Sequence, residues 1–110
     1  MVRPTRFEIA ELTESTEFLL SITGELDLNT APELARRVED SLGAEVRKVT
    51  LDLSELTFMD SSGLRLLIEL NQRAGRDGWE LRLIAPKHES ASAVLRLTGA
   101  DTALPFEGRA

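Results

Sequence analysis

A short run of hydroxyl and carboxyl side chains lies where an apolar segment gives way to a helical pattern. The run is Asp60-Ser61-Ser62-Gly63, and apolar residues at helical spacing follow it. A serine in the first turn of a helix lies near unpaired backbone N–H groups and the positive end of the helix dipole. Such a serine can act only as a structural cap, or it can accept a phosphate, because a helix start tolerates added negative charge. The residues alone leave both interpretations open.

Other chemistries lack the residues that they need. A serine hydrolase would require His88 to approach the two serines, and the Gly-x-Ser-x-Gly segment of such enzymes is missing. Asp52 and Asp60 form a conceivable carboxylate pair, but Asp52 alternates with leucines and is expected on the surface of a strand. The sequence has no cysteine and one histidine, which excludes thiolate and all-histidine metal sites, and it has no Gly-rich nucleotide loop.

Composition and charge narrow the class of partner. The chain has 110 residues, 42% hydrophobic and 29% charged, which is typical of one globular domain with a modest core. Thirteen basic and nineteen acidic residues give a net charge of −6, which argues against binding to nucleic acid or anionic lipid and favours a basic partner surface. The sequence shows neither the apolar run of a signal peptide nor a segment of membrane-spanning length. We therefore expect a cytoplasmic protein without nucleic-acid or membrane partners.

The first half of the chain predicts a hairpin, a helix and a central strand. Apolar segments at 7–12 and 18–23 flank a polar turn and predict two antiparallel strands. The segment Thr30-Ala31-Pro32-Glu33 matches a capping box with proline in the first turn, so a helix is expected from there to Gly43. Alternation of apolar and polar residues predicts a central strand over 46–53 that leads into the serine turn.

The second half predicts two more helices and two more strands. A helix is expected from the serine turn to about Gly75–Gly78, with a core face made of Leu64, Leu67, Ile68, Asn71 and Ala74. A strand at 79–84 should follow, with Trp79 buried and its indole N–H near the rim. The last elements expected are a helix over 91–97 that ends at Gly99 and a short edge strand at 103–106.

This order of elements predicts an α/β fold. We expect a mixed sheet of four to five strands, an initial hairpin followed by alternating helix and strand, with the helices packed against the sheet. Residues 1–110 then form a single domain with its core at about 6–107. The serine turn would lie beyond the carboxyl end of a central strand, where open α/β sheets usually present functional loops.

The motifs resemble those of a known family. The segment 58–64, preceded by Gly24-Glu25-Leu26-Asp27 and by Thr30-Ala31, resembles the STAS domain of bacterial anti-sigma factor antagonists. Pro86 and Thr98-Gly99 fit the same scheme, and the resemblance covers nearly the whole chain. The fold that it implies is the one expected from the order of elements.

The resemblance implies partner switching rather than catalysis by this chain. In that family the unmodified antagonist binds an anti-sigma factor that is also a serine kinase, and this binding releases the sigma factor. Phosphorylation by the kinase abolishes the binding, and a PP2C-type phosphatase reverses it. ATP and Mg²⁺ belong to the kinase, so no cofactor is expected here.

The resemblance also implies roles for individual residues. Ser61, the first serine after the aspartate, corresponds to the phosphoacceptor. Ser62 and Gly63 shape the turn, and together with Asp60 and Asp27 they are expected on the surface that binds the partner. An alternative remains, since STAS domains also serve as phosphorylation-independent scaffolds and as small regulatory subunits of stress-signalling or lipid-transport complexes.

Two further residues are expected at the partner surface. Some antagonists have a small residue after Gly-Leu, where this chain has Arg65. Arg65 can approach an anion, which would be a phosphate or a partner carboxylate, or it can stay solvated on the helix. Leu66 points nearly opposite Leu64 and Ile68 on a helical projection. Partner contact, packing under a neighbouring loop and simple exposure are all open for Leu66.

Overall fold

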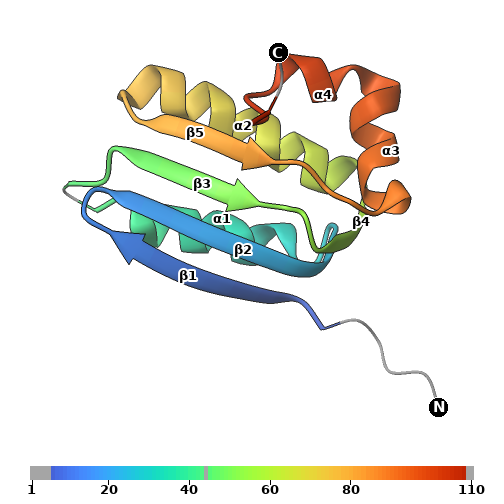
Figure 1. The fold of residues 1–110 in the computed structure, drawn as a ribbon, viewed down its shortest axis with the longest axis horizontal. Helices are drawn as coiled ribbons and strands as arrows, with labels where there is room; N and C mark the ends of the chain where they lie inside the picture. Colours follow the sequence, from blue (N-terminus) through green and yellow to red (C-terminus); the bar gives the residue numbers. More distant parts are fainter. Residues whose placement is uncertain (1–5, 44, 109–110) are drawn as a thin grey trace.

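Five strands form one mixed sheet in the computed structural model, which describes residues 6–43 and 45–108 (Figure 1). The strands are β1 (Glu8–Glu14), β2 (Glu17–Leu26), β3 (Lys48–Asp52), β4 (Leu56–Met59) and β5 (Glu80–Ile84). Their order is β1-β2-β3-β5, while β4 pairs with β2 alone. The β1–β2 pair is antiparallel and the other pairs are parallel. The predicted mixed sheet that opens with a hairpin is confirmed.

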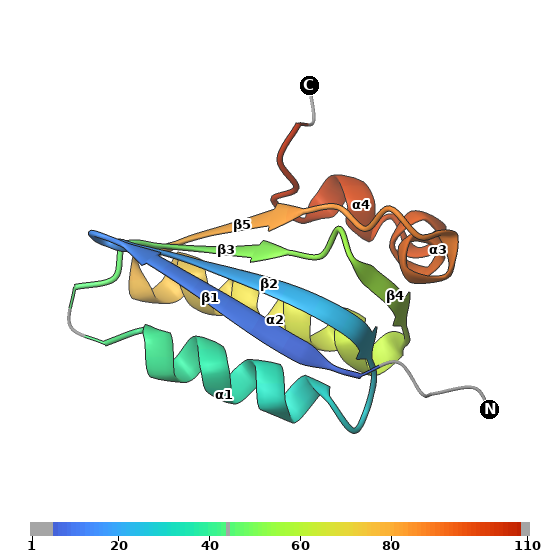
Figure 2. The ribbon, with the colours of Figure 1, turned by 60° about the horizontal axis from the view of Figure 1, so that its bottom comes forward.

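Two helices cover one face of this sheet. Figure 2 shows α1 (Ala31–Ser41) and α2 (Ser61–Asp77) beneath the strands, with α3 (Glu89–Thr98) and α4 (Ala100–Ala103) beyond the end of β5. The connections β2–α1–β3 and β4–α2–β5 join parallel strands, so crossovers of one hand bring both helices to the same face. The opposite face of β1, β2 and β3 carries no helix in the described part of the chain.

The prediction of one central strand leading to the serine turn is wrong in one respect. The chain turns after β3, where the Asp52 carboxylate accepts a hydrogen bond from the Ser54 N–H at 2.9 Å. The Leu56 N–H then bonds to the Leu53 carbonyl, and the chain resumes as β4. The serine turn therefore follows β4, which pairs with the far half of β2 and is also contacted by α3 through a Ser90 hydroxyl that donates to the Thr57 carbonyl.

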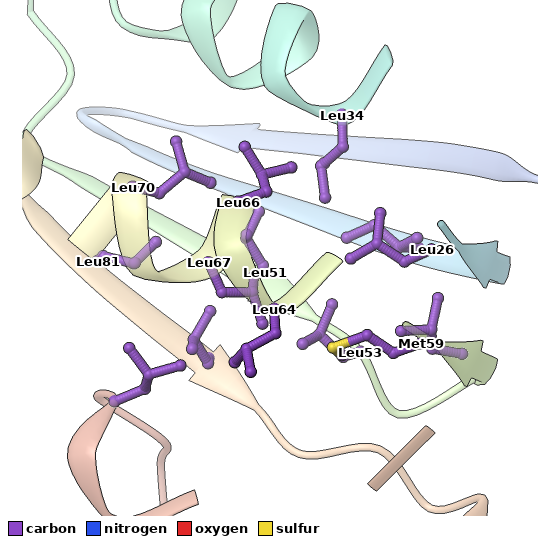
Figure 3. Close-up of a cluster of buried hydrophobic side chains, with 14 of the residues drawn as sticks. Leu26, Leu34, Leu51, Leu53, Met59, Leu64, Leu66, Leu67, Leu70 and Leu81 are labelled. Atoms are coloured by element: carbon purple, nitrogen blue, oxygen red, sulfur yellow. The ribbon is translucent and has the colours of Figure 1, made fainter. Parts of the chain in front are cut away.

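The hydrophobic core lies between the sheet and the two helices (Figure 3). Leu20, Ile22 and Leu26 of β2 face it, and α1 contributes Leu34 and Val38. From α2 the buried residues are Gly63, Leu64, Leu66, Leu67, Leu70 and Ala74.

The predicted core face of α2 is partly wrong. Ile68, expected in the core, is 38% exposed, whereas Leu66 is only 8% exposed. Figure 3 shows Leu66 between α2 and Leu34 of α1. The buried arc is displaced because α2 packs against α1 as well as against the sheet, and a projection of one helix does not show its neighbour.

The end of the chain differs from prediction in one element. α3 ends at Gly99, which has φ 79°, as expected for a left-handed cap. The predicted edge strand at 103–106 is wrong, because residues 100–103 form α4 and only a single bridge joins Phe106 to Leu83 of β5. Pro105 has no N–H to extend the pairing.

The indole N–H of Trp79 is buried without a partner among the described residues, rather than lying near a rim.

A glycine allows α2 to begin directly against β2. A Cβ on Gly63 would lie 2.8 Å from the Leu26 carbonyl oxygen and 2.8 Å from Met59 Cγ, closer than side chains tolerate. Both obstacles belong to the core or to strand backbone, so neither can move at low cost. The first turn of α2 therefore approaches the end of β2 as closely as backbone atoms allow.

We predict that Gly63→Ala lowers the free energy of unfolding by about 1 to 3 kcal/mol, because the new methyl overpacks this contact. Gly75→Ala is the matched control within α2, since a Cβ there meets nothing within 4 Å. That control should raise stability by about 0.5 to 1 kcal/mol. Urea unfolding followed by fluorescence of Trp79, the one tryptophan of a chain without tyrosine, measures both. Equal effects of the two substitutions would contradict the prediction.

Candidate functional site

Two loops from distant parts of the sequence meet at the start of α2. One follows β2 and contains Asp27, and the other joins β4 to α2 and contains Asp60. The Asp60 N–H bonds to the Leu26 carbonyl at 3.2 Å, which links the two loops directly. The structure thus brings together the Gly24–Asp27 segment and the serine turn, which the resemblance placed on one surface.

Asp60 is the residue that caps α2. Its Oδ1 accepts hydrogen bonds from the N–H groups of Ser62 at 2.8 Å and Gly63 at 3.2 Å, and its carbonyl accepts from the Leu64 N–H. A carboxylate at this position satisfies otherwise unpaired N–H groups and faces the positive end of the helix dipole. Interpreting the serines as the structural cap is therefore wrong, since the aspartate before them performs that function.

The Ser61 hydroxyl is left without a structural task. Ser61 is the first residue of α2 and is exposed, and its hydroxyl forms no hydrogen bond within residues 6–43 and 45–108. The Ser62 hydroxyl likewise forms no hydrogen bond among these residues, but Ser62 is less exposed. An exposed, uncommitted hydroxyl can be modified without loss of a native contact, and Ser61 meets this condition better than Ser62.

Asp27 organises the other loop. Its Oδ1 accepts hydrogen bonds from the Asn29 N–H at 2.9 Å and the Thr30 N–H at 3.1 Å. The Thr30 hydroxyl accepts from the Asp27 N–H at 2.9 Å and donates to the Glu25 carbonyl at 2.7 Å. The predicted capping box is therefore wrong in its bonding. Thr30 is the N-cap of α1, but its hydroxyl is turned back into the loop and makes no cap bond.

The charges around Ser61 are mostly negative. Asp60 directly precedes it and is half-buried, as is Asp27 in the adjoining loop, and Glu25 is exposed near the end of β2. Arg65 is exposed one helical turn after Ser61 and makes no ion pair with any residue that the structure describes. Among the described residues, this face therefore presents the carboxylates of Asp27 and Asp60, which backbone N–H groups hold in place, and the Arg65 guanidinium, which no carboxylate holds.

Two leucines lie near this site, one predicted there and one that sequence reasoning missed. Leu66 packs against α1 rather than under a loop, at 8% exposure, and it reaches the surface only at the edge of a groove. Sequence reasoning missed Leu28, which is 72% exposed in the Asp27 loop. The available signal was a single leucine between Asp27 and Asn29, where a polar turn residue is ordinary.

The described residues show neither a metal site nor a membrane helix. No three histidine, aspartate or glutamate side chains among them are placed to hold a metal ion. In the same part of the chain, every helix is too short or too polar to cross a bilayer.

The fold and this pair of loops define the class of the protein. The STAS domain family matches residues 9–108, and the chain belongs to that family.

Solved structures of anti-sigma factor antagonists share the fold. One from Mycobacterium paratuberculosis has a TM-score of 0.78 at 21% identity, covering 94% of this chain and 87% of that one. SpoIIAA of Bacillus matches in its unphosphorylated form with a TM-score of 0.72 at 18% identity, covering 92% and 85%. Its phosphorylated form gives 0.66 at 18%, covering 92% and 88%.

The same fold occurs within a larger membrane protein. The murine anion transporter Slc26a9 matches with a TM-score of 0.67 at 14% identity, covering 86% of this chain and 16% of that one. At such identities the likeness shows the fold alone, so function has to be argued from the site.

We predict that Asp60→Ala lowers the free energy of unfolding by about 1 kcal/mol, because two N–H groups of α2 lose their acceptor. Asp60→Asn keeps an acceptor oxygen in the same place and should lose much less. Ser61→Ala should leave stability within about 0.5 kcal/mol of the native chain, since the hydroxyl makes no described contact. Urea titrations of the three variants measure these differences, and a loss in Ser61→Ala equal to that in Asp60→Ala would restore the serine as the cap.

Proposed function

We propose that the chain is an anti-sigma factor antagonist of a partner-switching pathway, a regulator and not an enzyme. In its unmodified form it binds an anti-sigma factor that is a serine kinase and thereby releases the sigma factor. The observation that carries the proposal is the exposed and uncommitted Ser61 hydroxyl beside the capping carboxylate of Asp60. The kinase brings its own ATP and Mg²⁺, a PP2C-type phosphatase reverses the modification, and the cycle takes place in the cytoplasm.

Charge explains why phosphorylation would act on binding. A phosphate adds about −1.5 to −2 charges at neutral pH, next to Asp60 and Asp27 on a chain that already carries −6. The helix dipole stabilises a negative group at an exposed N-terminus by about 0.3 to 1 kcal/mol, so the domain keeps its fold. A partner surface that fits the unmodified serine would instead meet a bulky anion.

Two solved forms of one similar protein support this proposal. SpoIIAA, whose fold this chain shares, has been solved in an unphosphorylated and a phosphorylated form, so a domain of this shape accommodates the modification. Asp27, Asp60, Ser62 and Gly63 enter the proposal as the residues that hold Ser61 at the partner surface. Phosphorylation-independent scaffolding, the alternative use of a STAS domain, requires none of these to change on binding.

We predict that Ser61→Asp weakens binding to the cognate anti-sigma kinase at least tenfold, or about 1.4 kcal/mol. Ser61→Ala should bind as the native chain does and should accept no phosphate from the kinase and ATP. Ser62→Ala is the matched control and should still be phosphorylated. Isothermal titration calorimetry and mass spectrometry of the kinase reaction measure these outcomes. Equal affinity of Ser61→Asp and native chain would replace the proposal with the scaffold function.

A further inference from the structure

A shallow apolar groove runs between the starts of α1 and α2, directly beside the serine turn. Its cavity has a volume of about 250 Å³ and is open to solvent. The apolar side chains that line it are Leu28, Ala31, Pro32, Ala35 and Leu66. Ser62 lies on its wall, so the groove begins one residue from the proposed phosphorylation site.

Packing of the domain does not account for this groove. Leu28 is 72% exposed, and no described part of the chain covers it. On the α1 side, the small residues Ala31 and Ala35 are one helical turn apart and leave a trough above Leu66. An exposed leucine beside a trough of small residues is typical of a surface that becomes buried on binding.

The groove continues along the seam between the helices. A second cavity of about 300 Å³ shares Ala35, Leu66 and Glu69 with the first and extends to Leu70. Leu66, which lines both cavities, and Leu70 of the second cavity are one turn apart on α2. A helix bound along the groove would present its own side chains at i and i+4 with the same spacing. The ion pair of Arg73 with Glu39 of α1 lies at the far end and raises the pKa of Arg73.

The charges at the rim select the kind of segment that fits. Arg65 and Glu69 line the groove from α2, and neither makes an ion pair with a described residue. The other arginines of α2 differ, since Arg73 and Arg76 both contact Asp77. Arg65 is therefore the cation that α2 leaves for a partner, and a carboxylate is its natural counter-ion.

We propose that this groove binds an amphipathic helix of the anti-sigma kinase. The helix inserts aliphatic side chains one turn apart over Leu66 and Leu70 and places a carboxylate on Arg65. Helices that bind in grooves use such spacing. The inference rests on the proposed function, because it takes the partner from there. It adds an attractive contact that is separate from the serine and holds the kinase while Ser61 faces it.

Matched pairs of substitutions test the groove against the rest of the surface. The probe is the purified kinase that phosphorylates Ser61, titrated calorimetrically into unmodified chain. Leu28→Asn should weaken binding roughly tenfold, whereas Leu97→Asn, at a leucine 80% exposed on α3, should change it less than twofold. Arg65→Gln should weaken binding roughly fivefold, and Arg36→Gln on the exposed side of α1 should not.

Nuclear magnetic resonance provides a second readout that does not depend on any substitution. On addition of the kinase, the methyl signals of Ala31, Ala35 and Leu28 should shift, whereas that of Leu97 should not. Unchanged affinity of Leu28→Asn together with unshifted alanine methyl signals would refute the proposal that the groove binds the kinase. In that case a loss of binding in Ser61→Asp would still support the proposed function, whereas full binding by Ser61→Asp would refute the proposed function itself.

Discussion

The close contact between the first turn of α2 and the end of β2 holds the site together. Because Gly63 has no side chain, the helix backbone lies directly against the Leu26 carbonyl and Met59. Asp60 stabilises the same contact with hydrogen bonds to both elements. Its N–H donates to the Leu26 carbonyl, and its carboxylate accepts from two N–H groups of α2. A helix fixed in this way presents Ser61 at a defined place on a rigid element, which is what recognition by a partner requires.

The two aspartates of the site have structural tasks that constrain any switching mechanism. Asp27 and Asp60 each use one carboxylate oxygen to hold backbone N–H groups, Asp27 in its own loop and Asp60 in the first turn of α2. Their charges cannot move away from a phosphate on Ser61 unless those bonds break. Repulsion between fixed carboxylates and the new group is therefore not relaxed inside the domain, and it adds to the negative field that an approaching partner meets.

The sequence was a good guide wherever one local signal decided the structure. Alternation of side chains and turn residues located the hairpin, and Gly99 ended α3 as expected. Prediction failed where a second element competed for the same group. The Thr30 hydroxyl could accept a hydrogen bond from the first turn of α1 or from the Asp27 N–H, and it accepts from Asp27. The burial of Leu66 depended on α1, which the pattern of a single helix does not contain.

The sequence singled out residues that meet at the start of α2, but it did not show which of them makes the capping bonds. Hydroxyl and carboxyl groups at a helix start are interchangeable as caps, so the pattern could not tell that Asp60 would cap and leave Ser61 free. Leu28, Ser61 and Arg65 share one property in the structure: no described contact of the fold needs their side-chain ends. Stability alone gives no reason for an exposed leucine, a free hydroxyl and an unpaired arginine to lie around one helix start. Binding of a single partner that covers all three side chains gives such a reason.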